Sequence, residues 1–189
     1  MLQVFDRRSE IPTSVQLAFV ADQDTWINSV IPAAYVESTF CLTSGYSIEN
    51  DVIEDGNLEA LLVGSEGASY RADLSDFLDW YALALSRHLA DLKNPIALHP
   101  QYVLDPTQRP TLLALHPGEV FPSATRASLL ENYNKLVRGK SLLALLIRNT
   151  NTRPGQPKHS DKALLEIVAA RPGPLLTRLT RAIEAILVT

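Results

Sequence analysis

The sequence predicts an α/β protein with a small, mainly parallel sheet and a helical C-terminal region. Two short apolar segments near the N-terminus each end at a polar loop, as buried parallel strands do. A helix-start signal follows the second segment, and apolar residues then recur mostly at helical spacing. We therefore expect an α/β core over residues 1–70 and a helix-rich region over residues 71–189.

The first seventy residues predict two strands and a helix. After a short helical piece that ends before Pro12, Val15–Ala21 is a strand that is apolar on both faces. The second strand spans Thr39–Thr43. Ser47 is a good N-cap for the helix that follows, with Asn50 three residues further on. Strand, acidic loop, strand and helix is the order of an α/β sheet.

The rest of the chain predicts helices on either side of a proline-rich segment. Asp73 is the expected N-cap of a long helix that ends near Lys93. Six of the twelve prolines lie in residues 94–122, where we expect no helix and two short strands, at 96–98 and 111–115. Four further helices are expected at residues 123–137, 139–148, 160–170 and 174–187.

Composition excludes several classes of protein. The chain has 189 residues, of which 46% are hydrophobic and 20% charged, as in ordinary globular domains. The single cysteine, Cys41, excludes an internal disulfide framework and a cysteine-based zinc finger. No run approaches the roughly 18 apolar residues of a membrane helix, and the first residues lack a secretory signal. We expect a cytoplasmic protein with no membrane association.

Charge is distributed unevenly along the chain. Residues 1–122 contain 17 acidic and 6 basic side chains, whereas residues 123–189 contain 4 acidic and 11 basic ones. Such asymmetry is typical of an acidic, metal-binding part beside a basic, anion-binding part. The alternative is that the basic residues line the solvated faces of the C-terminal helices.

Asp22 and Asp24 follow the first predicted strand directly. Ligands of parallel sheets bind beyond the carboxyl ends of the strands, and two carboxylates in such a turn can face Mg²⁺ or Mn²⁺. A cation there points to phosphoryl or phosphodiester chemistry. The alternative is a strand-ending turn in which the aspartates bond local amides. Glu49 is a candidate third ligand or general base, or else it complements the helix dipole.

Arg138, Lys140, Arg148 and Lys158 are candidates for contacting nucleic-acid phosphates. The alternative is that they form a solvated helix face. The segment Arg138–Ser141 is not a phosphate-binding loop, because the motif's first glycine is absent and a helix precedes it. The four histidines do not cluster, so no metal site or catalytic dyad is expected from them.

Three segments together resemble a known family. They are Val20-Ala-Asp22-Gln-Asp24 at a strand end, Ser47-Ile-Glu-Asn50 after the next strand, and Arg138-Gly-Lys-Ser-Leu-Leu near the C-terminus. The chain looks like an uncharacterised bacterial Toprim-like family, often found with ATPases in phage-defence and overcoming-lysogenization-defect-like systems. The resemblance spans most of the chain, although each motif is short.

The resemblance implies a partial Toprim-like core and metal-dependent nucleic-acid phosphodiester processing in phage defence. Asp22 and Asp24 would hold Mg²⁺ or Mn²⁺, Glu49 would be the catalytic or supporting acid, and a partner ATPase is implied. Toprim domains also carry a glutamate after an earlier strand, and nothing before Asp22 fits it. We expect either a chain that begins partway through its domain or a degenerate relative without nuclease activity.

A second class of function stays open beside the nuclease. A non-catalytic interaction module would dock its acidic and basic parts on an ATPase or on nucleic acid, without turnover. In either class, an apolar first strand that is paired on one side only predicts self-association through its open edge.

Overall fold

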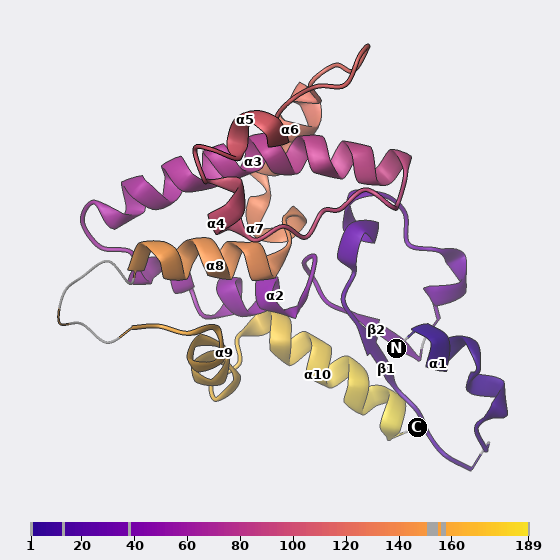
Figure 1. The fold of residues 1–189 in the computed structure, drawn as a ribbon. Helices are drawn as coiled ribbons and strands as arrows, with labels where there is room; N and C mark the ends of the chain where they lie inside the picture. The colour runs from indigo at the N-terminus through magenta and orange to yellow at the C-terminus, as the bar shows by residue number, and fades with distance from the viewer. Residues whose placement is uncertain (1, 13, 38, 151–154, 156–157, 189) are drawn as a thin grey trace.

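The computed structural model describes residues 2–12, 14–37, 39–150, 155 and 158–188. It confirms an α/β fold with a small parallel sheet and a helical C-terminal region. Figure 1 shows a body of helices with the two strands at one side of it. No helix in these residues is long and apolar enough to cross a membrane.

Within the described residues, the sheet consists of β1 (Phe19–Ala21) and β2 (Phe40–Leu42), which pair in parallel. Phe19 lies opposite Phe40. The prediction of a strand that begins at Val15 and is buried on both faces is wrong. Pairing with β2 covers only Phe19–Ala21, and Val15 is 50% exposed. The outer edge of β1 pairs with no described strand, so self-association stays a prediction.

A small aromatic cluster supports the sheet. Helix α1 (Leu2–Asp6), which confirms the predicted N-terminal helical piece, places Phe5 against both strands. The Phe5 ring packs edge-on against Phe19 and Phe40, with centroids 5.0 and 4.8 Å away. Edge-on packing of this kind is favoured by the quadrupoles of aromatic rings, so these contacts stabilise the packing of α1 on the sheet.

The predicted capping box begins α2 (Ile48–Asp55). The backbone amide of Ser47 donates to Asn50 Oδ1 at 2.9 Å, and the Ser47 side chain accepts from the Asn50 amide. These reciprocal bonds satisfy two amides that would otherwise lack a partner at the helix start. The start of α2 is therefore fixed directly after β2.

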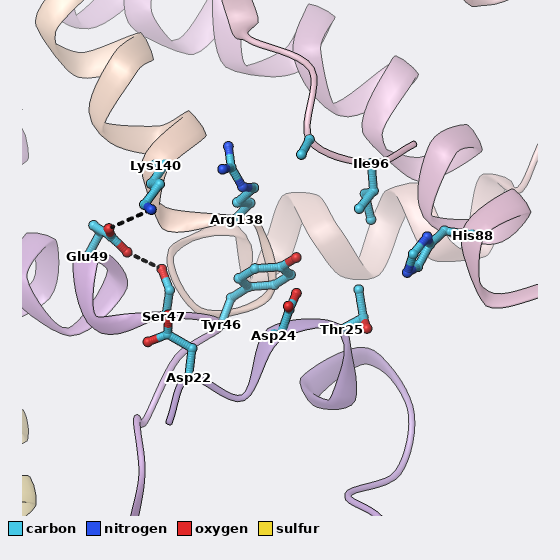
Figure 2. Close-up of a pocket in the computed structure, with 11 residues that line it drawn as sticks. Asp22, Asp24, Thr25, Tyr46, Ser47, Glu49, His88, Ile96, Arg138 and Lys140 are labelled. Carbon is cyan, nitrogen blue, oxygen red and sulfur yellow. Dashed lines mark hydrogen bonds and ion pairs between the residues drawn. The ribbon is translucent and has the colours of Figure 1, made fainter. Parts of the chain in front are cut away.

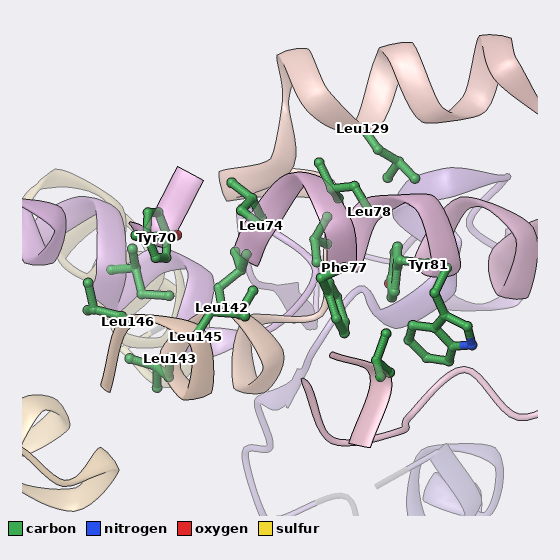
Figure 3. Close-up of a cluster of buried hydrophobic side chains, with 14 of the residues drawn as sticks. Tyr70, Leu74, Phe77, Leu78, Tyr81, Leu129, Leu142, Leu143, Leu145 and Leu146 are labelled. Atoms are coloured by element: carbon green, nitrogen blue, oxygen red, sulfur yellow. The ribbon is translucent and has the colours of Figure 1, made fainter. Parts of the chain in front are cut away.

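The long helix α3 (Glu66–Ala90) is the centre of the helical body. It begins seven residues before Asp73, so the prediction of Asp73 as N-cap is wrong. Tyr70 explains the difference, because it is buried one turn before Leu74 and extends the apolar stripe of the helix. Helix α3 packs against α6 (Ser123–Glu131) and α8 (Gly139–Thr150), as Figure 3 shows.

The proline-rich segment contains two one-turn helices, α4 (Pro100–Val103) and α5 (Arg109–Leu112). The predicted absence of helix there is wrong, and neither expected strand forms. The prolines permit this because each helix has a proline in its first turn, where the missing N–H has no helical acceptor.

The C-terminal helices are close to those predicted. The first expected helix is divided at Asn132 into α6 and α7 (Tyr133–Leu136), whereas α8, α9 (Asp161–Ala169) and α10 (Pro174–Leu187) are confirmed. Asp55 joins α10 to α2, because its carboxylate accepts from the amides of Leu175 and Leu176 at 3.0 and 2.8 Å.

Candidate functional site

A cleft of about 340 Å³ lies where the loops after both strands meet the turn between α7 and α8 (Figure 2). Asp22, Asp24 and Glu49 line its acidic side, and Arg138 and Lys140 line its basic side. The structure therefore brings together all three predicted acidic residues and two of the four predicted basic residues. Its other lining residues are Thr25, Tyr46, Ser47, His88, Ile96 and Ala97.

Asp22 reaches from the end of β1 to the start of α2. Its Oδ1 accepts from the Ile48 amide at 2.9 Å. Although Asp22 is solvent-accessible, the surrounding protein displaces enough water to raise the pKa of its carboxyl. The charges of Glu49 and Asp24 raise this pKa further, whereas the Ile48 amide and Lys140 lower it. Close negative charges around an accessible carboxylate favour a bound cation.

Asp24 is held in the left-handed backbone region, with a φ of 52°. This conformation costs a non-glycine residue on the order of 1 kcal/mol or more, and such residues gather at functional sites. Tyr46 holds Asp24 through the backbone, because the Asp24 amide donates to the Tyr46 carbonyl at 2.7 Å, and the Tyr46 hydroxyl lines the same cleft as the Asp24 carboxylate. Burial, together with Asp24, raises the pKa of that hydroxyl.

Glu49 is the most enclosed of the three acids. Ser47 Oγ donates to Glu49 Oε2 at 2.6 Å, and Lys140 Nζ lies 3.9 Å from Glu49 Oε1. The Glu49 side chain is 10% exposed, whereas that of Lys140 is 64% exposed. Glu49 therefore has partners at both oxygens and links the acidic side of the cleft to its basic side.

The basic side is fixed by a junction between Asn50 and Gly139. Asn50 Nδ2 donates to the carbonyls of Asn134 and Val137 at 2.7 and 2.8 Å. A Cβ at Gly139 would lie 2.5 Å from Asn50 Oδ1 and 2.6 Å from Ser47 Oγ, so only glycine fits there. Through this junction, the start of α2 determines where Arg138 and Lys140 lie.

A second cavity of about 590 Å³ continues from the basic side along α8. Arg138 and Lys140 line both cavities, and Arg148 lines the second. Arg148 Nε pairs with Asp73 Oδ2 at 3.0 Å, yet the Arg148 side chain stays 48% exposed. Lys158 is exposed and lines neither of these two cavities, whereas the other three predicted basic residues each line at least one of them.

The described residues include no group of three His, Cys, Asp or Glu side chains placed to hold a metal ion. Glu49 faces Lys140 rather than the two aspartates. Mg²⁺ is nevertheless often bound through one or two carboxylates, with water and substrate phosphate at its other positions. Asp22 and Asp24 line one cleft, and the charge of Asp24 acts on the Asp22 carboxyl, so their chemistry suits an open site of that kind rather than a closed cage.

Two titratable lining residues, Tyr46 and His88, were not predicted as part of a site. Tyr46 directly precedes the Ser47–Asn50 motif, and its place beside that motif was the available signal. His88 lies on α3, far from the acidic residues in the chain, so no sequence spacing could indicate that it faces them.

No family model matches the chain, and neither the curated proteins nor the solved structures contain a match to it. The Toprim-like resemblance therefore depends only on the short motifs that carry it.

Proposed function

We propose that the cleft binds a divalent cation together with a nucleic-acid phosphodiester and cleaves that phosphodiester. The observation that carries the proposal is that Asp22, Asp24 and Glu49 share one cleft with Arg138 and Lys140. These acidic and basic residues come from opposite halves of the chain, and the Asn50–Gly139 junction holds them together. Adjacent sites for a cation and for an anion suit a substrate in which a phosphate bridges the two.

Each group has a distinct role in this proposal. Asp22 and Asp24 hold Mg²⁺ or Mn²⁺, which when bound polarises a phosphoryl oxygen and lowers the pKa of a bound water. Arg138 and Lys140 bind the non-bridging phosphate oxygens as positive charges. Glu49 is the supporting acid that positions Lys140, with which it is paired. Phage defence and a partner ATPase follow from the resemblance alone.

The second cavity extends the phosphate-binding surface in this proposal. Arg148 lies beyond Lys140 along α8, so a strand whose phosphate occupies the cleft would run toward Arg148. Affinity should then fall linearly with salt on a log–log scale, by roughly 0.7–0.9 per phosphate neutralised. Lys158 remains a proposed contact of the same strand outside both cavities.

The experiment is a cleavage assay on single- and double-stranded DNA and RNA with Mn²⁺ or Mg²⁺. The wild-type protein should cleave, and Asp22→Asn/Asp24→Asn should not, because it keeps the shape of the site and removes its charge. Glu131→Gln is the matched control, since Glu131 is exposed on α6 and lines neither cavity. Equal cleavage by wild type and the double variant would contradict the proposal.

A non-catalytic binding module is the second candidate. It is favoured by the pairing of Glu49 with both Ser47 and Lys140, because a carboxylate with a partner at each oxygen is a weaker base and a weaker cation ligand. This candidate predicts nucleic-acid binding with a clear salt dependence and no cleavage at any cation concentration. The same assay therefore separates the two candidates.

A further inference from the structure

His88 lines the candidate cleft at the end away from Asp22 and Glu49 (Figure 2). It lies in the last turn of α3, is half-buried, and lines the cleft together with Asp24 and Thr25 (Figure 2). Imidazole is the side chain most often used to move protons near neutral pH. Its place at this cleft raises the question of which ring nitrogen keeps a lone pair.

The loop after α3 determines the tautomer of His88. Nδ1 lies 2.8 Å from the Asn94 carbonyl oxygen, which can only accept, so Nδ1 carries the hydrogen. In the neutral ring, Nε2 therefore has a lone pair. The side chain of Asn94 fixes this loop by donating to the carbonyls of Arg87 and Asp91 at 3.2 and 3.1 Å.

The Nε2 atom is free to accept a proton. Within the described part of the chain, no hydrogen-bond donor is recorded at Nε2. The other charged or titratable groups that line the cleft come from three places. Asp22, Asp24 and Tyr46 follow the strands, Glu49 lies in the first turn of α2, and Arg138 and Lys140 lie at the start of α8. On its own side, Asp91 and Lys93 lie in the exposed loop, and Arg87 is paired with Glu119.

We propose that His88 is the general base of the cleavage reaction, an inference that rests on the proposed function. Nε2 takes a proton from the attacking water as the water oxygen bonds to phosphorus. The phosphorus–oxygen ester bond breaks, its electron pair stays on the leaving oxygen, and that oxygen takes a proton from solvent. Glu49 is a poorer candidate for this step, because Ser47 and Lys140 already engage its two oxygens.

The kinetic test compares wild type with His88→Gln in the full chain, with Mn²⁺ present. Gln keeps a polar amide of similar size and cannot act as a base at neutral pH. We expect cleavage to fall about 100-fold or more, the usual contribution of general-base catalysis. The acidic limb of the rate–pH profile should disappear, while Mn²⁺ affinity stays the same. Imidazole in solution should partly restore cleavage by His88→Gly.

His116→Gln is the matched control, because His116 is exposed in the loop before α6 and lines neither cavity. It should behave as wild type. An unchanged rate and pH profile in His88→Gln would overturn the role of His88 and leave the proposed function standing. No cleavage by the wild-type protein with Mn²⁺ bound would overturn both.

The tautomer can be tested without any substrate. Nitrogen-15 NMR of the neutral His88 ring should show the Nδ1-protonated form, and His88→Gln identifies the signal. A ring protonated at Nε2 would present no lone pair to the cleft and would overturn the proposal by itself.

Discussion

The helical body and the two-stranded sheet differ sharply in how much apolar surface each buries. Among the described residues, 22 buried hydrophobic side chains form the cluster around α3 and α8, whereas three form the cluster at the sheet. The basic residues of the candidate site stand on the large region, and Asp22 and Asp24 stand on loops of the small one. We therefore expect local opening of the sheet region to cost less free energy than local opening of the helical body.

The largest effect is expected in the helical body. Leu145 on α8 is fully buried in its core, so Leu145→Ala should lower the free energy of unfolding by about 2–5 kcal/mol. Leu130→Ala is the control, because Leu130 is 45% exposed on α6. Urea unfolding measures both. A loss no larger than that of Leu130→Ala would contradict the assignment of this cluster as the main core.

The next effect is expected at the junction of the two regions. Asn50→Asp keeps the acceptor for the Ser47 amide and turns a carboxylate oxygen toward the carbonyls of Asn134 and Val137. Because Asn50 is 1% exposed, we expect a loss of about 3 kcal/mol in urea unfolding. Asn132→Asp is the control, since its side-chain amide is exposed and donates weakly. Equal stability of the two variants would show that the junction does not join the regions.

The close approach at Gly139 predicts that two glycine substitutions change the stability of the protein in opposite directions. Gly139→Ala should destabilise by about 1–3 kcal/mol, because its Cβ would lie 2.5 Å from Asn50 Oδ1. Gly67→Ala on α3 meets nothing nearer than 3.6 Å, so it should stabilise the helix by up to about 1 kcal/mol. Thermal unfolding of the two variants tests this difference. Two shifts of the same sign would contradict it.

The smallest effect is expected at the acidic side of the cleft. Burial and neighbouring carboxylates raise the pKa of Asp22 in the folded protein, so its ionisation favours the unfolded chain. Its contribution to stability therefore falls as pH rises through its titration, and Asp22→Asn should be more stable than wild type at pH 7. We expect a gain of about 0.5 kcal/mol, since water screens so exposed a group. A loss of stability at pH 7 would contradict this.

Local signals predicted the elements that depend on neighbouring residues. Ser47 with Asn50 predicted the start of α2, and Pro174 predicted that of α10. Asp73 failed as an N-cap because buried packing of Tyr70, one turn earlier, continues the helix past it. A local capping preference is worth about 1 kcal/mol, which burial of one aromatic ring exceeds.

The candidate site was predicted only in part. Asp22, Asp24 and Glu49 follow from strand ends and a helix start, which are local features. That Arg138 and Lys140 lie over them depends on Gly139 packing against Asn50, a contact between residues far apart in the chain. His88 reaches the cleft only because α3 ends beside it.

The most direct test of a shared site for cation and phosphate is calorimetry with Mn²⁺ on wild type, Asp22→Asn/Asp24→Asn and Lys140→Gln. The double aspartate variant should lose binding. Lys140→Gln should bind Mn²⁺ more tightly, because the positive charge that acts on the Asp22 carboxyl is gone, and should bind nucleic acid more weakly. Equal Mn²⁺ binding by all three proteins, with nucleic-acid binding unchanged in Lys140→Gln, would contradict a shared site.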